Sequence, residues 1–416
     1  MSMGVPMRPT QQQLENYADI IVRVGVNVQP NQKVVVMAPI TAAPLVRLVS
    51  SRAYAAGARD VHVEYNDEEL TRIRFKQAPE ESFSEYPAWR ANAMKGFADE
   101  GAAFIQIYSP NPDLLNDIDP DRMATSSKTA STALAPYRNA LMNHENAWTL
   151  VSYATPEWSA KVFPGIPVEE AVEKLWDRII DATRIGLDNP VSAWEEHNAT
   201  LLSMVDRLNA KRYAELRYTA PGTELTIGLP DGHLWLGGSK ENSRGVMFNP
   251  NMPTEEVFTM PHKDRVNGTV RSTKPLNYNG QVIDGFSLTF KDGKVVEFSA
   301  EQGYETLSKL LATDEGAVQL GEVALVPNDS PISNSGITFF NTLYDENASC
   351  HLALGQAYPV NLEGGSDLSP EELAARGSNR SLVHEDFMIG SPEMDIDGVT
   401  QDGKIEPIFR AGNWAL

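Results

Sequence analysis

Residues 33–39 read "KVVVMAP", a short and continuous run of mostly β-branched residues. Such a run is typical of a strand that is buried on both faces of a sheet. An amphipathic helical pattern follows over residues 42–58 and ends near Gly57. Three more strand-like runs come later, at residues 60–66, 103–109 and 147–155. Strands separated by helical stretches of this length predict a parallel sheet that is flanked by helices.

Helix signals surround this region. Thr10 is a candidate N-cap with Gln13 three residues later, which is a capping-box pattern. Strong helical patterns also cover residues 167–186 and 193–212. Neither GxGxxG nor GxxxxGK[ST] follows any of the strand-like runs, so the common phosphate-binding loops are missing. The expected sheet therefore need not bind a nucleotide.

The character of the sequence changes near its middle. Residues 187–192, "LDNPVS", are rich in turn formers and mark the expected domain boundary. From about residue 213, strand-like runs alternate with Pro-Gly and Asp-Gly turns, and "KDGK" at 291–294 indicates a hairpin. The sequence thus predicts an α/β domain with a mostly parallel, helix-flanked sheet over residues 1–190. A β-rich α+β domain is expected over residues 191–416.

Composition limits the classes of partner. The 416 residues carry a net charge of −21, which opposes phosphate backbones, so no nucleic-acid partner is expected. No run approaches the ~18 apolar residues of a membrane helix, and residues 1–17 contain no apolar signal segment. We therefore expect no membrane partner. The single cysteine, Cys350, excludes an internal disulfide and favours a reducing, cytoplasmic location.

An acidic side chain interrupts an apolar run at residues 320–327, "LGEVALVP". In a strand, Glu322 shares a face with Ala324 and Val326. An ionised carboxylate there costs several kcal/mol unless it is paired or bound to a metal. The alternative is an edge strand whose glutamate meets solvent or pairs with a lysine.

Two further segments offer metal-ligand types. In "SLVHEDFMIG", His384 and Asp386 lie two residues apart, so an extended strand points both to the same face. Imidazole and carboxylate together suit zinc and its neighbours, although a simple hydrogen-bonded pair has the same pattern. In "TEEVF", alternation places Glu256 on the face of Phe258 and Glu255 on the opposite face, where solvent is expected.

The stretch "ENASCHLALGQAY", residues 346–358, allows three interpretations: a cysteine-nucleophile site, a helical core segment or part of a metal site. His351 and Tyr358 would share a face of a helix, or approach each other through a bend at Gly355. A nucleophilic Cys350 needs an imidazole that points at its sulfur, which an adjacent histidine rarely does. Neither GxSxG nor HExxH occurs. The remaining histidines show no convergent carboxylates and are expected to be ordinary; they are His62, His144, His197, His233 and His262.

Several of these segments together resemble one family, the M29 metallo-aminopeptidases, also called the thermophilic metalloprotease or aminopeptidase T family. The matching stretches are residues 251–261, 268–283, 320–358 and 384–390. The resemblance is dense over the second domain and looser over the first. It implies two divalent metal ions, zinc, cobalt or manganese, and a set of ligands with a tyrosine beside them. On the matching positions the implied metal-site residues are Glu256, Glu322, His351, Tyr358, His384 and Asp386.

The resemblance also implies an activity. It predicts a metal-dependent aminopeptidase that hydrolyses N-terminal residues of peptides through a metal-activated water, with Glu322 and Tyr358 as catalytic residues and Cys350 as a bystander. A homodimer is implied, with the first domain limiting access and contributing to dimerisation. Two alternatives stay open: a dinuclear metallohydrolase of other amides or esters, and a non-catalytic homologue that binds metal or peptide.

Overall fold

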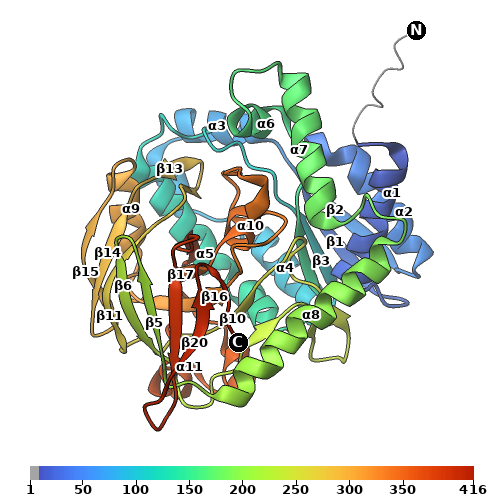
Figure 1. Ribbon diagram of the computed structural model, residues 1–416. Helices are drawn as coiled ribbons and strands as arrows, with labels where there is room; N and C mark the ends of the chain where they lie inside the picture. The colour runs from blue at the N-terminus through green and yellow to red at the C-terminus, as the bar shows by residue number, and fades with distance from the viewer. Residues whose placement is uncertain (1–8) are drawn as a thin grey trace.

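The computed structural model describes residues 9–416, so the first eight residues of the expected N-terminal domain, and with them part of the segment searched for a signal, lie outside the described residues. A helix-flanked parallel sheet occupies the N-terminal part, and two antiparallel sheets dominate the C-terminal part (Figure 1). The predicted fold class is confirmed. Among residues 9–416, no helix combines the length and the apolar content that a membrane crossing requires.

The N-terminal sheet has four parallel strands in the order β2-β1-β3-β4. The strands are β1 (Lys33–Pro39), β2 (Asp60–Asn66), β3 (Ala103–Ile107) and β4 (Trp148–Val151). Val34 and Val36 pack into a core on one face, and Val35 packs into a smaller core on the other. Burial on both faces explains the continuous β-branched run of β1.

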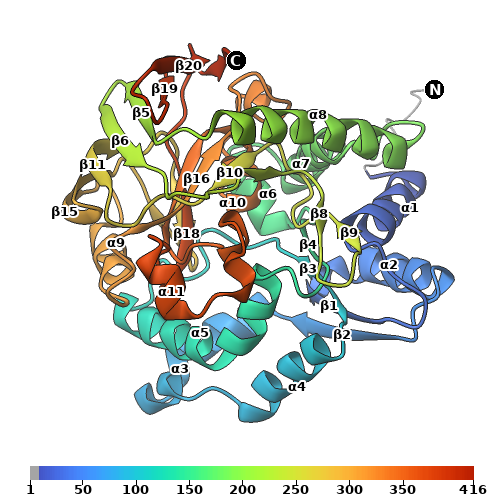
Figure 2. The ribbon, with the colours of Figure 1, turned by 90° about the horizontal axis from the view of Figure 1, so that it is seen from below.

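Helices cover both faces of this sheet (Figure 2). Those on one face are α1 (Gln11–Ile20), α2 (Ala43–Ala55) and α7 (Val168–Thr183), and those on the other are α4 (Ala88–Asp99) and α5 (Pro120–Met142). The capping box is present: Thr10 Oγ1 accepts from the Gln13 amide, and Gln13 Oε1 accepts from the Thr10 amide. Further helices are α3 (Glu68–Gln77), α6 (Pro156–Val162) and α8 (Pro190–Lys211).

An eight-stranded antiparallel sheet forms the outer wall of the C-terminal part, in the order β15-β14-β11-β6-β5-β19-β20-β21. Its strands are β5 (Glu215–Ala220), β6 (Thr223–Gly228), β11 (Val266–Arg271), β14 (Ser287–Lys291), β15 (Lys294–Ser299), β19 (Asp395–Val399), β20 (Ile405–Arg410) and β21 (Asn413–Trp414). The predicted hairpin joins β14 to β15, and both Asp292 (φ 48°) and Gly293 (φ 84°) are left-handed, as a type I′ turn requires.

A five-stranded antiparallel sheet packs against this wall, in the order β18-β17-β16-β10-β7. Its strands are β7 (Leu236–Gly237), β10 (Val257–Thr259), β16 (Leu320–Leu325), β17 (His351–Gly355) and β18 (His384–Met388). Val323, Leu325 and Leu352 enter the core shared with the larger sheet. Because β16 is the central strand, an edge position for Glu322 is wrong. Residues 351–355 form a strand, so the helical interpretation is also wrong.

Short elements complete the chain. They are β8 (Lys240–Glu241), β9 (Met247–Phe248), β12 (Leu276–Tyr278), β13 (Gln281–Ile283), α9 (Tyr304–Leu311), α10 (Thr342–Asp345) and α11 (Pro370–Ala375). The core beneath the parallel sheet also receives Phe248, Met252 and Leu343 from the C-terminal half. The boundary expected between residues 190 and 191 falls at the start of α8 and stays a prediction.

Candidate metal centre

One face of the five-stranded sheet gathers the polar side chains of three neighbouring strands. In the antiparallel register Asp386 lies opposite Ala353, and Ala353 lies opposite Glu322. His384 lies opposite Gly355. Directly opposed residues are about 4.5–5.5 Å apart at their Cα atoms, so the small residues of β17 leave room for the larger acidic and imidazole groups on either side.

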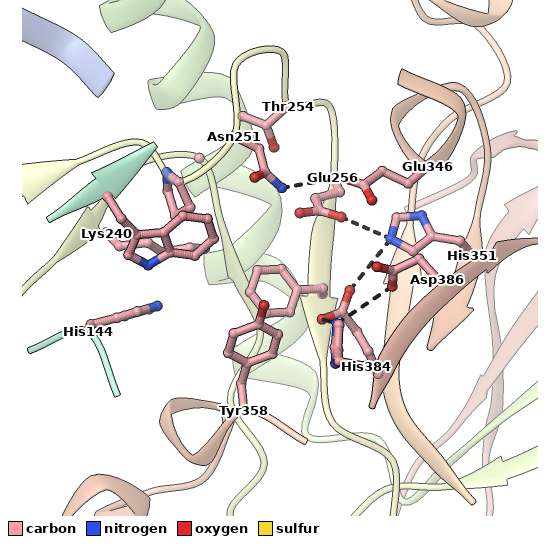
Figure 3. A pocket seen from close by; sticks show the side chains of 15 residues that line it. His144, Lys240, Asn251, Thr254, Glu256, Glu346, His351, Tyr358, His384 and Asp386 are labelled. Atoms are coloured by element: carbon pink, nitrogen blue, oxygen red, sulfur yellow. Dashed lines mark hydrogen bonds and ion pairs between the residues drawn. The ribbon is translucent and has the colours of Figure 1, made fainter. Parts of the chain in front are cut away.

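Glu256 joins the group from the segment that leads into β10. Phe258 lies opposite Ala324, which in turn lies opposite His351. Glu256 precedes Phe258 by two residues and therefore points to the same face. Its Oε2 lies 3.1 Å from Nε2 of His351 (Figure 3). The preference for Glu256 over Glu255 in the sequence therefore agrees with the geometry.

The side chains form two groups whose donor atoms lie within 4.8 Å of one another. Glu256, Glu322 and His351 make the first group, and Glu322, His384 and Asp386 make the second. Nε2 of His351 is 3.5 Å from Oε1 of Glu322, while Nε2 of His384 is 3.7 Å from the other oxygen, Oε2. Ligands bonded at about 2.0–2.2 Å to one ion lie at such separations. Glu322 thus belongs to both groups through different oxygens.

The hydrogen bonds of the two histidines direct the same ring atom into the site. Nδ1 of His351 lies 3.1 Å from the carbonyl oxygen of Ser349, and Nδ1 of His384 lies 2.7 Å from that of Gln356. A proton on Nδ1 donates to each carbonyl, and the lone pair of Nε2 stays available for a metal. Nε2 of His351 and Oδ1 of Asp386 are buried and make no well-directed hydrogen bond within residues 9–416, although Nε2 of His351 faces the carboxylate of Glu256. The residues present fit a divalent cation.

The electrostatics of the site favour added positive charge. Burial raises the pKa of Glu322 above its usual value. Burial works against a charged His351, yet the carboxylates of Glu256 and Glu322 outweigh it and raise the pKa of this ring well above its usual range. The protein alone therefore attracts protons to a cluster of carboxylates, and divalent cations would compete for the same atoms.

Tyr358 enters the site through a bend after β17. Gly355 has φ 101°, and a Cβ there would lie 2.2 Å from the carbonyl oxygen of Val383, so no other residue fits. The ring of Tyr358 meets that of His384 edge-on at 4.9 Å between centroids and lines the same cavity. All six expected site residues, Glu256, Glu322, His351, Tyr358, His384 and Asp386, therefore line one cavity.

Two buried charged groups of this cavity were not anticipated from the sequence. Glu346 lies at the start of a short 3₁₀ turn, where Asn251 donates to its Oε1 at 3.2 Å. Lys240 lies on β8. His144, expected to be ordinary, also lines the cavity, and burial lowers its pKa to about 3, so it is neutral. The sequence around Lys240 and His144 contains no motif that would mark them as site residues. For Glu346 the only signal is that it is a polar residue within "ENASCH".

Two expectations about charged neighbours are wrong. Glu255 does not meet solvent: it is 8% exposed, and its Oε1 pairs with Arg184 at 2.9 Å. His197 does have a carboxylate partner, because its Nε2 lies 3.7 Å from Oε2 of Glu255. Helices α7 and α8 cover this face of the segment, which alternation within the segment alone does not reveal. His62 similarly lies 3.8 Å from Glu64.

Cys350 faces away from the cavity. It packs in the core between the two antiparallel sheets, and its Sγ lies 3.3 Å from the carbonyl oxygen of Val326. Burial raises the pKa of this thiol to about 11, which is the reverse of what a nucleophilic cysteine needs. The cysteine-nucleophile interpretation has no support in this geometry.

Known proteins match the chain over nearly its whole length. The model of the thermophilic metalloprotease family, M29, matches residues 10–414. Aminopeptidase 2 of Geobacillus stearothermophilus is 61% identical over 410 residues, which is 99% of each chain. Aminopeptidase AmpS of Bacillus subtilis is 52% identical over 97% of this chain and 99% of its own. The solved structure of wild-type AmpT from Thermus thermophilus has a TM-score of 0.89 at 45% identity and covers 97% of this chain and 99% of that one.

Proposed function

The chain belongs to the thermophilic metalloprotease family M29, and on that premise we propose that it is a cytoplasmic aminopeptidase that hydrolyses N-terminal residues of peptides with two divalent metal ions. Its relatives carry the name aminopeptidase at identities of 45–61%. The observation that carries the two-metal proposal is the pair of donor groups that share Glu322. The location rests on one buried, unpaired cysteine, Cys350, which suits a reducing compartment.

Each donor group would hold one ion. Glu256 and His351 would hold one ion, His384 and Asp386 would hold the other, and Glu322 would contribute to both. Carboxylates and imidazoles suit zinc, cobalt and manganese alike. The chemistry that such a pair of ions supplies is to lower the pKa of the attacking water and to polarise the scissile carbonyl.

Glu346 is the proposed proton acceptor. Its Oε1 accepts from the side-chain amides of Asn251 at 3.2 Å and Asn347 at 3.3 Å, which fix the carboxyl group. Burial first, and then the charge of Asp386, raises its pKa well above the usual range. A carboxylate with a raised pKa takes a proton from water more readily than an exposed one. In this role Glu346 receives the proton of the attacking water and returns it to the leaving amine when the C–N bond breaks.

Tyr358 is the proposed donor to the developing oxyanion. Burial, followed by the charge of Glu322, raises the pKa of its hydroxyl well above the usual value, so the group stays protonated and able to donate. Donors that face the position of developing charge stabilise the transition state.

The N-terminal domain is proposed to restrict access to the site. His144 and Trp148 come from that domain and line the cavity. Leu150 of β4 forms an isolated backbone β-bridge with Asn251. A narrowed entrance would favour peptide ends over folded chains. We also propose a homodimer, for which light scattering is the test.

The test is release of an aminoacyl chromophore by the purified protein. One substrate is supplied with a free amino group and with an acetylated one, each with and without a chelator. The proposal expects cleavage of the free form alone, loss of cleavage with the chelator and recovery with added zinc, cobalt or manganese. Equal cleavage of both forms would favour a hydrolase of other amides or esters, and no cleavage with any of these metals would favour a binding homologue.

A further inference from the structure

Lys240 is a buried lysine whose amino group has no polar partner among the described residues. It is 6% exposed, and its Nζ makes no hydrogen bond within residues 9–416. No carboxylate in this part of the chain lies within ion-pair distance of it. Its nearest favourable contact is the ring of Phe258, whose centroid lies 4.6 Å from Nζ. Such a contact contributes about 0.5–2 kcal/mol, less than the cost of burying an unpaired charge.

The position of this lysine relates it to the reaction site. Lys240 lines the cavity that also contains the two donor groups. Figure 3 places it across the cavity from His351 and Asp386. The wall around Lys240 includes His144, which is neutral. One wall of the cavity is thus rich in carboxylates, and the opposite wall holds a single ammonium group.

The carboxylates of the far wall do not account for this ammonium group. Glu256 and Glu322 influence it electrostatically, yet both are proposed metal ligands. Two divalent cations would offset the negative charge of that wall, and Lys240 would then face no net negative charge from the protein. An anion that enters the cavity from outside would pair with Lys240 and favour its charged form, because a buried charge is stable only when paired.

The proposed reaction brings such an anion in. An aminopeptidase holds the N-terminal residue and the scissile carbonyl at the metal ligands, so the rest of the substrate extends into the remaining cavity. In a dipeptide the free carboxylate comes one residue later, at most about 3.6 Å further along the chain. In a longer peptide that position is an uncharged amide.

We propose that Lys240 binds the C-terminal carboxylate of a dipeptide substrate and thereby makes this enzyme favour dipeptides over their C-terminal amides. This inference rests on the proposed aminopeptidase function and adds a substrate class to it. A hydrogen bond to a charged group is stronger than one between neutral groups. Burial lowers the pKa of Lys240 to about 7, and a bound carboxylate would hold the proton on Nζ.

The experiment compares one dipeptide with its C-terminal amide, using the metal-loaded wild-type protein and Lys240→Met. Methionine keeps the length and volume of the side chain and removes the charge. The ratio of kcat/KM for the free dipeptide to that for the amide should fall by roughly 10- to 100-fold in Lys240→Met, in line with the loss of a charged hydrogen bond. The exposed Lys294 of β15 provides the matched control, and Lys294→Met should keep the wild-type ratio.

A second readout separates binding from a structural role. Because Lys240→Met removes a buried amino group that has no polar partner, the metal-free variant should melt no lower than the metal-free wild type. An unchanged ratio in Lys240→Met, or equal losses on both substrates, would overturn the inference. A wild type that cleaves neither substrate, nor any other peptide with a free amino group, would contradict the aminopeptidase function itself and the inference with it.

Discussion

Glu255 and Glu256 are adjacent in sequence, yet their carboxylates point to opposite sides of the segment and bind different partners. Glu256 Oε2 lies 3.1 Å from His351 Nε2, and Glu255 Oε1 lies 2.9 Å from the Arg184 guanidinium. The segment is held at two more points: the Glu255 amide donates to Asn347 Oδ1 at 2.7 Å, and His197 Nε2 lies 2.6 Å from the Thr254 carbonyl oxygen. The ion pair on one side therefore fixes the backbone that presents a metal-site carboxylate on the other.

Loss of Arg184 should destabilise the protein. Its side chain is 14% exposed and that of Glu255 is 9% exposed, so Arg184→Met leaves a buried carboxylate without its cation. Breaking a buried pair in this way costs about 3–5 kcal/mol. The free energy of unfolding from urea titration should fall by that amount, and Arg184→Met/Glu255→Gln should regain part of it. A single variant within 0.5 kcal/mol of wild type, an order-of-magnitude threshold for surface changes, would show that the pair is not structural.

Glu322→Gln should remove both metal ions and leave the fold intact. The amide has the shape of the carboxylate but lacks its charge, and both donor groups include Glu322. Even a lost outer partner of a metal ligand costs roughly 10- to 100-fold in affinity or activity, so kcat/KM should fall by at least that much. Metal content by mass spectrometry and circular dichroism check the two halves of the prediction. A variant that retains two tightly bound ions would refute the bridging role.

Glu346→Gln should lower kcat and leave the metal content unchanged. General-base catalysis contributes roughly 10²- to 10⁴-fold, and the buried Glu346 lies in the cavity without belonging to either donor group. Steady-state kinetics with a free-amino substrate gives the split between kcat and KM. If metal is lost together with activity, Glu346 is a ligand and the base lies elsewhere.

The stability of the metal-free protein should depend on pH in the range where Lys240 titrates. Burial lowers the pKa of Lys240 from its usual 10.5 to about 7 in the folded state. Between these values the unfolded chain binds a proton that the folded protein does not, so the wild type loses stability as the pH falls from 10.5 to 7. Lys240→Met lacks this group. The melting temperature of Lys240→Met minus that of the wild type should increase as the pH falls from 10 to 7, and it should stay constant below pH 7. The same difference at pH 10 and pH 7 would contradict a lowered pKa of Lys240.

Cys350 should be dispensable for chemistry. Its thiol contacts the backbone of Val326 within the core and has a pKa raised to about 11 by burial. Cys350→Ala should therefore keep the wild-type kcat/KM and lose about 1–2 kcal/mol of stability at most through the small cavity that it creates. Inactivation of the wild type by a thiol reagent under native conditions, absent from the variant, would argue against this assignment.

The ends of the strands in the parallel sheet could be predicted more accurately for some strands than for others. Residues 33–39 and 60–66 match β1 and β2 at both ends, because β-branched and alternating residues fill the whole of each strand. The run expected at 147–155 is longer than β4 (Trp148–Val151). The chain leaves the sheet after Val151, although apolar residues continue into the next loop and helix. The local composition indicates that these residues are buried, but it does not show where the hydrogen bonds of the strand end.

The sequence allowed most residues of the candidate site to be predicted, but not how they are arranged in space. His384 and Asp386 share a face because side chains alternate along a strand, and this could be predicted from the sequence. The neighbours of β16 are β10 and β17, and these two strands lie far from each other along the chain, so the meeting of Glu256 with His351 depends on sheet order. Lys240 carries no local pattern, because only its burial distinguishes it from a surface lysine.

The most direct measurement is a metal titration of activity. The chelated protein is titrated with zinc, cobalt or manganese while release of an aminoacyl chromophore is followed. We expect no turnover without metal, a plateau at two equivalents per chain and no cleavage of the acetylated substrate at any point. Full activity in the metal-free protein, or a plateau at one equivalent with no further ion bound, would contradict a dinuclear aminopeptidase.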